Sequence, residues 1–211
     1  MTDRPIIFSA PMIRALLAGT KTQTRRVMRG VRQDNHVVLR KASKRRMGIT
    51  THVLELERTG RLPYSPGDRL WVRENFAQPY APSKGHNGCI YRADGPEFLP
   101  GAAAVHQWGA EAKWTPSIHM PRWASRLTLV VTGVKVERLQ EISREDAIAE
   151  GCESPLIGTE APAPAHGVYL ADERTSFAQL WNRLHGEGAW RTNPWIVAVS
   201  FVTHMRNIDH E

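Results

Sequence analysis

Cysteine is scarce in this chain of 211 residues, where Cys89 and Cys152 are the only two. They form no CxxC pair and no metal-ligand spacing with histidine. The nine histidines contain no HxxxH or HExxH arrangement. We therefore expect two free thiols in a reducing compartment, with no bound metal and no cofactor.

Long apolar runs are also absent. The longest candidate, residues 195–202, has the length of a strand and falls far short of the roughly 20 residues that cross a bilayer. The first residues lack the basic start and long apolar middle of a signal peptide. We expect a cytoplasmic protein with no membrane partner. With 41% hydrophobic and 23% charged residues, the composition favours a single globular domain over residues 1–211.

Acidic residues are nearly missing from one stretch. Residues 21–46 are rich in lysine and arginine and contain a single acid, Asp34. The whole chain carries a net charge of +7 and has an isoelectric point near 9.8. This basic segment favours encounter with anions, including RNA. A solvated surface is the alternative reading of such a charge run.

Local signals predict where the first elements begin and end. Ser9 can cap a helix that stops at Gly19, since glycine tolerates the left-handed conformation after a helix. Residues 20–26 are then expected on a turn just past the helix. Residues 69–74 alternate as a strand, which places Glu74 on the same face as the apolar positions before it.

Further elements follow from periodicity and capping patterns. Strands are expected at 52–57, 89–92, 126–138 and 195–203, and helices at 143–150 and 175–184. In the second helix, an apolar stripe that includes Phe177, Trp181 and Leu184 is expected in the core. This order of elements indicates an α+β domain with a curled sheet or small barrel.

Three blocks of this sequence resemble the ASCH domain family. The first block is Gly19-x-Lys21-x-x-Thr24-x-Arg26, and the second runs from Gly67 to Glu74 (GDRLWVRE). The third block joins residues 177–181 to residues 193–195 and a last strand. The opening segment FSAPMIRALLAGTKTQTRR is similar to the bacterial and phage branch of the family.

The resemblance implies a PUA-like β-barrel with flanking helices. Relative to a minimal member, this chain carries long insertions at about 27–51, 76–121 and 152–172. Some small members are amidohydrolases that remove the acyl group from N4-acetylcytidine, and others are described as RNA-binding or ribonuclease-like proteins. The matching catalytic positions in this chain are Lys21, Thr24 and Glu74. The implied partner is a modified pyrimidine nucleoside or base, with RNA on the basic segment as the alternative.

Amide hydrolysis by these residues has two open versions. In one, a neutral Lys21 activates the Thr24 hydroxyl, an acyl-enzyme forms, and Glu74 moves the proton to the leaving amine. In the other, Glu74 activates water while Lys21 and Thr24 polarise the carbonyl. The first version requires a desolvated lysine, or a proton shared between Lys21 and Glu74. A helix-end lysine, a turn hydroxyl and a salt-bridged carboxylate are the structural alternatives.

Five further residues are candidates for substrate binding. Guanidinium groups suit phosphate or a planar carbonyl, indole rings can stack a base, and an amide can bond a base edge. For one of the two arginines and at least one of the two tryptophans, a structural role is expected instead. The candidates are Arg25, Arg26, Trp71, Asn75 and Trp195.

Overall fold

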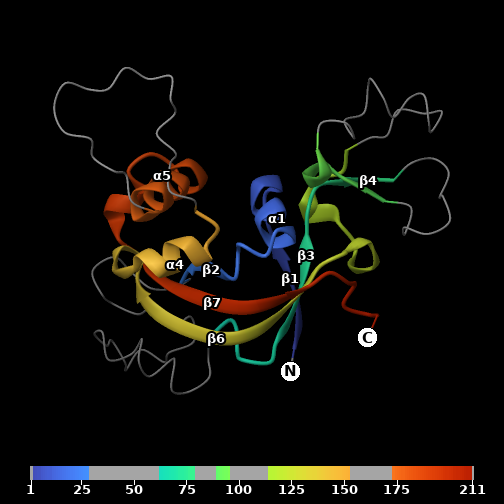
Figure 1. Ribbon diagram of the computed structural model, residues 1–211, viewed down its shortest axis with the longest axis horizontal. Helices are drawn as coiled ribbons and strands as arrows, with labels where there is room; N and C mark the ends of the chain where they lie inside the picture. The colour runs from blue at the N-terminus through green and yellow to red at the C-terminus, as the bar shows by residue number, and fades with distance from the viewer. Residues whose placement is uncertain (1, 29–61, 79–88, 96–113, 153–172, 211) are drawn as a thin grey trace, which may run out of the picture. The chain divides into compact units, whose positions relative to one another are not determined.

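The computed structural model describes residues 2–28, 62–78, 89–95, 114–152 and 173–210, and it has an α+β architecture with a mixed sheet (Figure 1). The predicted fold class is confirmed at this level. Five strands form the main sheet in the order β1-β3-β6-β7-β2. Their bounds are β1 Asp3–Ile7, β2 Gln23–Val27, β3 Arg69–Arg73, β6 Thr128–Arg138 and β7 Trp195–His204.

Pairing in this sheet is both parallel and antiparallel. Strand β1 runs parallel to β3, with Ile6 opposite Val72. Strands β3 and β6 are antiparallel, and so are β2 and β7, where Thr24 lies opposite Val199. A separate two-stranded sheet pairs β4, Phe76–Ala77, with β5, Ile90–Tyr91. Among the described strands β1 and β2 are the edges, so no closed barrel is formed there.

The described residues include three α-helices, each close to its predicted position. Helix α1 covers Ala10–Leu17 and is followed by Gly19 with a positive φ of 73°. Helix α4 covers Arg144–Ala149, and the Ser143 hydroxyl caps it by accepting a hydrogen bond from the Asp146 amide. Helix α5 covers Glu173–His185. Short 3-10 turns fill several connections.

The bounds of the 3-10 turns are η1 Arg92–Asp94, η3 Ser117–His119, η4 Arg122–Ala124, η5 Leu139–Glu141 and η6 Ala189–Thr192.

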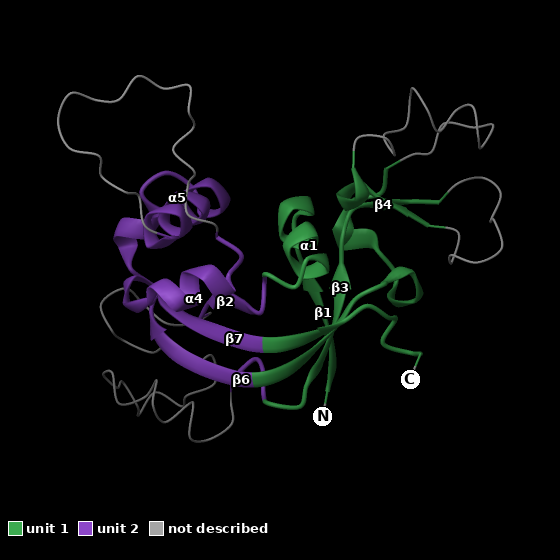
Figure 2. Ribbon diagram, in the orientation of Figure 1, with its two compact units in different colours: residues 1–20, 66–132, 201–211 green, residues 21–65, 133–200 purple. Residues whose placement is uncertain are grey.

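The chain divides into two compact units (Figure 2). The first unit contains residues 1–20, 66–132 and 201–211, and the second contains residues 21–65 and 133–200. A buried cluster in the first unit includes Phe76, Tyr91 and Met120. The core of the second unit gathers Phe177 and Trp181 of α5 with residues of α4 and β7. The single-domain assignment stays a prediction.

Two local predictions were wrong. Residues 23–26 are part of the edge strand β2 rather than a turn, because their backbone pairs with β7, almost 180 residues further along the chain. Leu184 is exposed although it continues the apolar stripe of α5, because it lies in the last turn, beyond the buried cluster that holds Phe177.

Several predictions fall wholly or largely outside the described residues. They are the strand at 52–57, most of the insertions at 27–51 and 76–121, nearly all of the insertion at 152–172, and the basic segment beyond residue 28. In the part of the chain that the structure describes, no helix is long and apolar enough to span a membrane.

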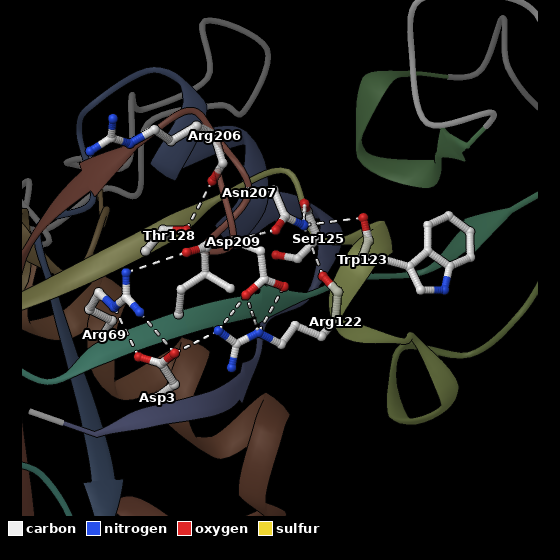
Figure 3. A network of polar contacts seen from close by, with 10 residues as sticks. Asp3, Arg69, Arg122, Trp123, Ser125, Thr128, Arg206, Asn207 and Asp209 are labelled. Carbon is white, nitrogen blue, oxygen red and sulfur yellow. Dashed lines mark hydrogen bonds and ion pairs between the residues drawn. The ribbon is translucent and has the colours of Figure 1, made fainter. Parts of the chain in front are cut away.

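The side chain of Asn207 attaches the C-terminal segment to the rest of the first unit (Figure 3). Its Nδ2 lies 2.9 Å from the Arg122 carbonyl oxygen, 3.1 Å from that of Trp123 and 2.6 Å from that of Ser125. Its Oδ1 accepts a hydrogen bond from the Asp209 amide at 2.8 Å. One buried amide therefore satisfies several backbone groups at once.

Arg122 joins the two ends of the described chain. Its guanidinium bonds the Asp209 carboxylate through Nε at 2.9 Å and the Asp3 carboxylate through an NH2 contact of 2.6 Å (Figure 3). Asp3 also accepts from Arg69 Nε at 2.9 Å. These bonds hold β1 and the C-terminal segment to the same turn, η4.

Candidate functional site

Lys21 is fully buried just before β2, and its amine bonds twice to one residue. Lys21 forms an isolated antiparallel bridge with Glu150, and the Thr22 amide donates to the Ala149 carbonyl at 2.8 Å. From this fixed backbone, Lys21 Nζ donates to the Glu150 carbonyl oxygen at 2.8 Å and to its carboxylate Oε2 at 2.6 Å. Lys21 is 0% exposed, so water screens this attraction poorly.

Arg25 lies among three carboxylates in the same unit. Its NH2 group is 2.8 Å from Glu137 Oε1 and 2.8 Å from Asp146 Oδ2, and its NH1 group is 3.3 Å from Glu150 Oε1. Lys135 contacts Glu137 from the solvent side at 2.6 Å. With Lys21, three cations face three acids, so the formal charges cancel. These contacts support the structural alternative for Arg25.

Thr24 and Arg25 are neighbours on β2 and therefore point to opposite faces of the sheet. Arg25 faces the acidic residues of α4 and its C-terminal end, so Thr24 faces the other side, where it is also buried. Arg26 follows on the Thr24 side and is half-buried. Burial lowers the pKa of Arg26, although the charges of Tyr64 and Glu150 oppose this.

These positions bear on the two versions of the chemistry. A neutral Lys21 acting on Thr24 would need its amine at the threonine hydroxyl, whereas the observed contacts hold that amine against Glu150. A carboxylate at 2.6 Å stabilises the ammonium form. The contacts of Lys21 therefore favour the version in which the lysine is a charged donor and not a base.

Glu74 follows β3 directly and continues its buried face. Leu70, Val72 and Glu74 are all buried, which confirms the predicted alternation. The carboxylate receives two bonds from Arg126, from Nε to Oε1 at 2.8 Å and from NH2 to Oε2 at 3.0 Å. Arg126 also contacts Asp94 at 2.7 Å. Burial raises the pKa of Glu74, Arg126 opposes that rise, and Asp94 adds to it.

Arg126 itself stacks over an aromatic ring. Its guanidinium carbon lies 4.0 Å from the centre of the Tyr91 ring, within the range of a cation–π contact. Tyr91 donates its hydroxyl to the Ala124 carbonyl at 2.9 Å, and burial raises its pKa. The Glu74 amide lies 3.2 Å from Met120 Sδ. Glu74 thus sits between an apolar cluster and one guanidinium.

The remaining predicted binding residues have structural contacts on at least one side. The Arg73 guanidinium lies 5.2 Å from the Trp71 ring centre, and Arg138 lies 4.4 Å from the Trp195 ring centre. Each indole thus has one face covered by an arginine. Asn75 accepts a hydrogen bond from the Ser117 amide at 2.9 Å, which fixes the connection before η3.

The predicted residues belong to both units. Lys21, Thr24, Arg25, Arg26 and Trp195 lie in the second unit, and Trp71, Glu74 and Asn75 lie in the first. The convergence of Lys21, Thr24 and Glu74 on one substrate stays a prediction. The carboxylate expected to share a proton with Lys21 was Glu74, whereas the carboxylate seen against its amine is Glu150.

Sequence reasoning missed Glu150, Glu137 and Arg126. The capping pattern at Ser143 and the glycine at 151 do place Glu150 at a helix end. No local pattern, however, links it to a lysine 129 positions earlier. Arg126 was seen only as the start of a predicted strand, and its pairing with Glu74 depends on β3 and β6 being neighbours.

Both cysteines are thiols outside any disulfide, as predicted, and both are buried. Burial raises the pKa of Cys152 to about 11, and the charge of Glu150 contributes to the rise. Thiolates are the reactive form of cysteine, so neither position favours a nucleophile. Within the described ranges, no group of three or more His, Cys, Asp or Glu side chains is arranged to hold a metal ion.

No protein-family model, no curated protein and no solved structure matches this chain.

Proposed function

We propose that this protein is a hydrolase that removes the acyl group from N4-acylated cytosine or cytidine, on a sheet of the PUA-like type. One observation carries the proposal. The three side chains that the ASCH resemblance assigns to catalysis, Lys21, Thr24 and Glu74, are 0%, 4% and 2% exposed. Burial of ionisable groups such as Lys21 and Glu74 costs free energy, and catalytic sites are where that cost is commonly accepted.

The reaction uses Glu74 as the base. Its carboxylate takes a proton from water, and the water oxygen bonds to the acyl carbon. The negative charge that develops on the acyl oxygen is stabilised by the Lys21 ammonium, with the Thr24 hydroxyl as a second donor. The carbon–nitrogen bond then breaks as Glu74 returns the proton to the N4 amine. The products are a carboxylic acid and cytosine or cytidine.

The environment of Glu74 suits this role. A carboxylate with a pKa above its ordinary value holds an abstracted proton better than an exposed one. The paired bonds from Arg126 fix its orientation. The reaction requires that the side chains of Lys21, Thr24 and Glu74 all reach one amide of the substrate.

The test uses purified protein, N4-acetylcytidine and a chelator, with the ultraviolet change on deacylation as the signal. We expect turnover by the natural protein and a loss of about 10²–10⁴-fold in Glu74→Gln, the range for removal of a general base. Lys21→Met should lose about 10²–10³-fold, the cost of one oxyanion donor. Thr24→Val should lose less, because a neutral hydroxyl stabilises a developing negative charge less than an ammonium does.

Matched controls exist for two of these variants. Glu173→Gln removes a buried carboxylate that pairs with Arg144, and Lys135→Met removes an exposed lysine. Both should retain turnover. Equal loss in the controls and in the three test variants would refute the assignment of the catalytic residues.

RNA binding and RNA cleavage stay as alternatives, each with its own outcome in the same assay series. The segment that favours RNA lies mostly outside the described residues. Salt-sensitive binding of single-stranded RNA without deacylation would support a binding module. RNA cleavage that survives repurification and disappears in Glu74→Gln would support a nuclease.

A further inference from the structure

We propose that Glu150 is the positioning residue for Lys21, holding its amine in place and in the charged form that polarises the acyl oxygen. This inference rests on the proposed function and assigns a residue that the ASCH resemblance leaves without a role. Glu150 reaches Lys21 through two different groups, a backbone carbonyl at 2.8 Å and a carboxylate oxygen at 2.6 Å.

The contact is built from the backbone upward. Glu150 is the C-terminal cap of α4, where carbonyl oxygens lack partners within the helix and attract cations. The bridge between residues 21 and 150 and the bond from Thr22 to Ala149 align the two segments. The amine therefore meets a helix-end carbonyl and a carboxylate at once, and bonds to both restrict where it can lie.

The second oxygen of the carboxylate is held from the other side. Glu150 Oε1 lies 3.3 Å from Arg25 NH1, and Arg25 is fixed in turn by Glu137 and Asp146. Among the described residues, Glu150, Arg25 and the buried thiol Cys152 lie around Lys21. Burial and the charge of Glu150 raise the pKa of Cys152, whereas Lys21 and Arg25 oppose the rise. Of these, Glu150 is the residue that bonds the amine, through its carboxylate and its backbone carbonyl.

Replacing the Glu150 carboxylate by an amide tests whether its charge positions Lys21 or whether its side chain only fills space. Glu150→Gln keeps the volume, the backbone carbonyl and the helix, but it removes the charge that stabilises the ammonium. Glu173→Gln is the matched control, since Glu173 is a buried carboxylate in a two-bond pair with Arg144 in the same unit and does not contact Lys21.

The first measurement needs no substrate. The chain has six lysines, at positions 21, 41, 44, 84, 113 and 135. Reductive methylation of the folded protein followed by peptide mass spectrometry gives the modification rate of each. We expect Lys21 to react far more slowly than Lys135, whose side chain is 65% exposed. Glu150→Gln should raise the Lys21 rate at least tenfold, since a neutral, less restrained amine is the reactive species, whereas Glu173→Gln should leave it unchanged.

The second measurement is the pH dependence of deacylation. We expect Glu150→Gln to lower kcat by up to about 10³-fold, the cost of one lost oxyanion donor, with little change in KM. Because the ammonium loses its counter-charge, the alkaline limb of the kcat profile should move to lower pH. Glu150→Asp, which keeps the charge, should recover part of the rate.

The outcomes separate the two proposals. Unchanged protection of Lys21 in Glu150→Gln overturns the positioning role whatever the activity. Lost protection with unchanged kcat and an unchanged pH profile overturns it as well. If the natural protein shows no deacylation, the proposed function fails and the positioning role in that reaction fails with it, while the methylation rates still decide whether Glu150 holds the amine. Lost protection together with a lower kcat supports both.

Discussion

Glu74 keeps a carboxylate almost completely out of water beside one guanidinium. Its pKa is raised because burial penalises the charged form more than Arg126 compensates. A group with a raised folded-state pKa contributes stability below its unfolded pKa, and this contribution is lost as the pH rises through the folded value. Arg126 therefore stabilises the ionised form of Glu74, which burial disfavours.

Replacing Arg126 by methionine should show this dependence directly. We expect Arg126→Met to lower the free energy of unfolding by about 3–5 kcal/mol at neutral pH, the usual cost of leaving a buried charge without its partner. Without Arg126 the pKa of Glu74 rises further, so the loss should shrink as the pH falls through that value and Glu74 becomes protonated. Urea unfolding of both proteins at neutral and mildly acidic pH measures the difference.

Arg92→Met serves as the control, because Arg92 is an exposed arginine of η1 close to Asp94 in the chain. Its effect should be small and independent of pH. A loss in Arg126→Met that is the same at both pH values would mean that the lost contact with Tyr91, and not the unpaired buried charge of Glu74, accounts for the destabilisation.

At the scale of elements, α4 is a helix of six residues whose C-terminal end holds Lys21. A helix this short has little stability of its own and depends on its caps and contacts. The Ser143 hydroxyl accepts the Asp146 amide at 3.0 Å, and Arg144 pairs with Glu173 of α5. Both ends of α4 are therefore fixed by specific bonds.

Removal of the N-terminal cap of α4 should lower the free energy of unfolding. We expect Ser143→Ala to lower the free energy of unfolding by about 0.5–2 kcal/mol and Ser143→Gly by only a few tenths, because glycine is tolerated at this position. Denaturant midpoints of the two variants test the order. A larger loss for glycine than for alanine would argue that the hydroxyl is not the source of the stability.

Local signals explain which elements could be predicted. Ser9 and Gly19 bound α1, Ser143 caps α4, and the alternation from Leu70 to Glu74 marks the buried face of β3, all within a few residues. Strand β2 could not be recognised in this way. Its residues, QTRRV, show no apolar alternation. They form a strand because their backbone pairs with β7 and because the Arg25 side chain forms ion pairs with buried carboxylates.

In the candidate site, too, some features follow from local sequence patterns and others depend on residues far apart in the chain. The burial of Glu74 follows from a local pattern, whereas Lys21 and Thr24 became candidates through the resemblance to the ASCH family. The partners of these residues, Glu150 and Arg126, come from segments 129 and 52 positions away. Only the pairing of elements brings them into contact, so no window along the chain predicts them.

At the scale of the whole molecule, the amide of Asn207 makes several of the bonds that attach residues 205–210, together with the Arg122–Asp209 ion pair. Asn207 is buried and its Nδ2 faces three backbone carbonyls. We expect Asn207→Ala to cost about 1–3 kcal/mol, because these buried acceptors lose their donor. Asp209→Asn, at a half-exposed ion pair, should cost about 0–1 kcal/mol.

Hydrogen exchange locates the effect of Asn207→Ala. Because Arg122 bonds both Asp209 and Asp3, loosening of the C-terminal segment should also speed amide exchange in β1. Faster exchange confined to residues 205–210, with β1 unaffected, would show that the two ends are independent of each other.

Because the Arg122 guanidinium forms ion pairs with both Asp3 and Asp209, the two ends of the described chain lie close together. A tag fused to either end would leave the folded protein from the same spot, and a short peptide linker could join the ends without crossing the surface. Donor and acceptor dyes placed at residues 2 and 210 would then transfer energy efficiently in the folded protein and poorly once the chain opens. The pair would give an optical reading of unfolding that needs no knowledge of the substrate.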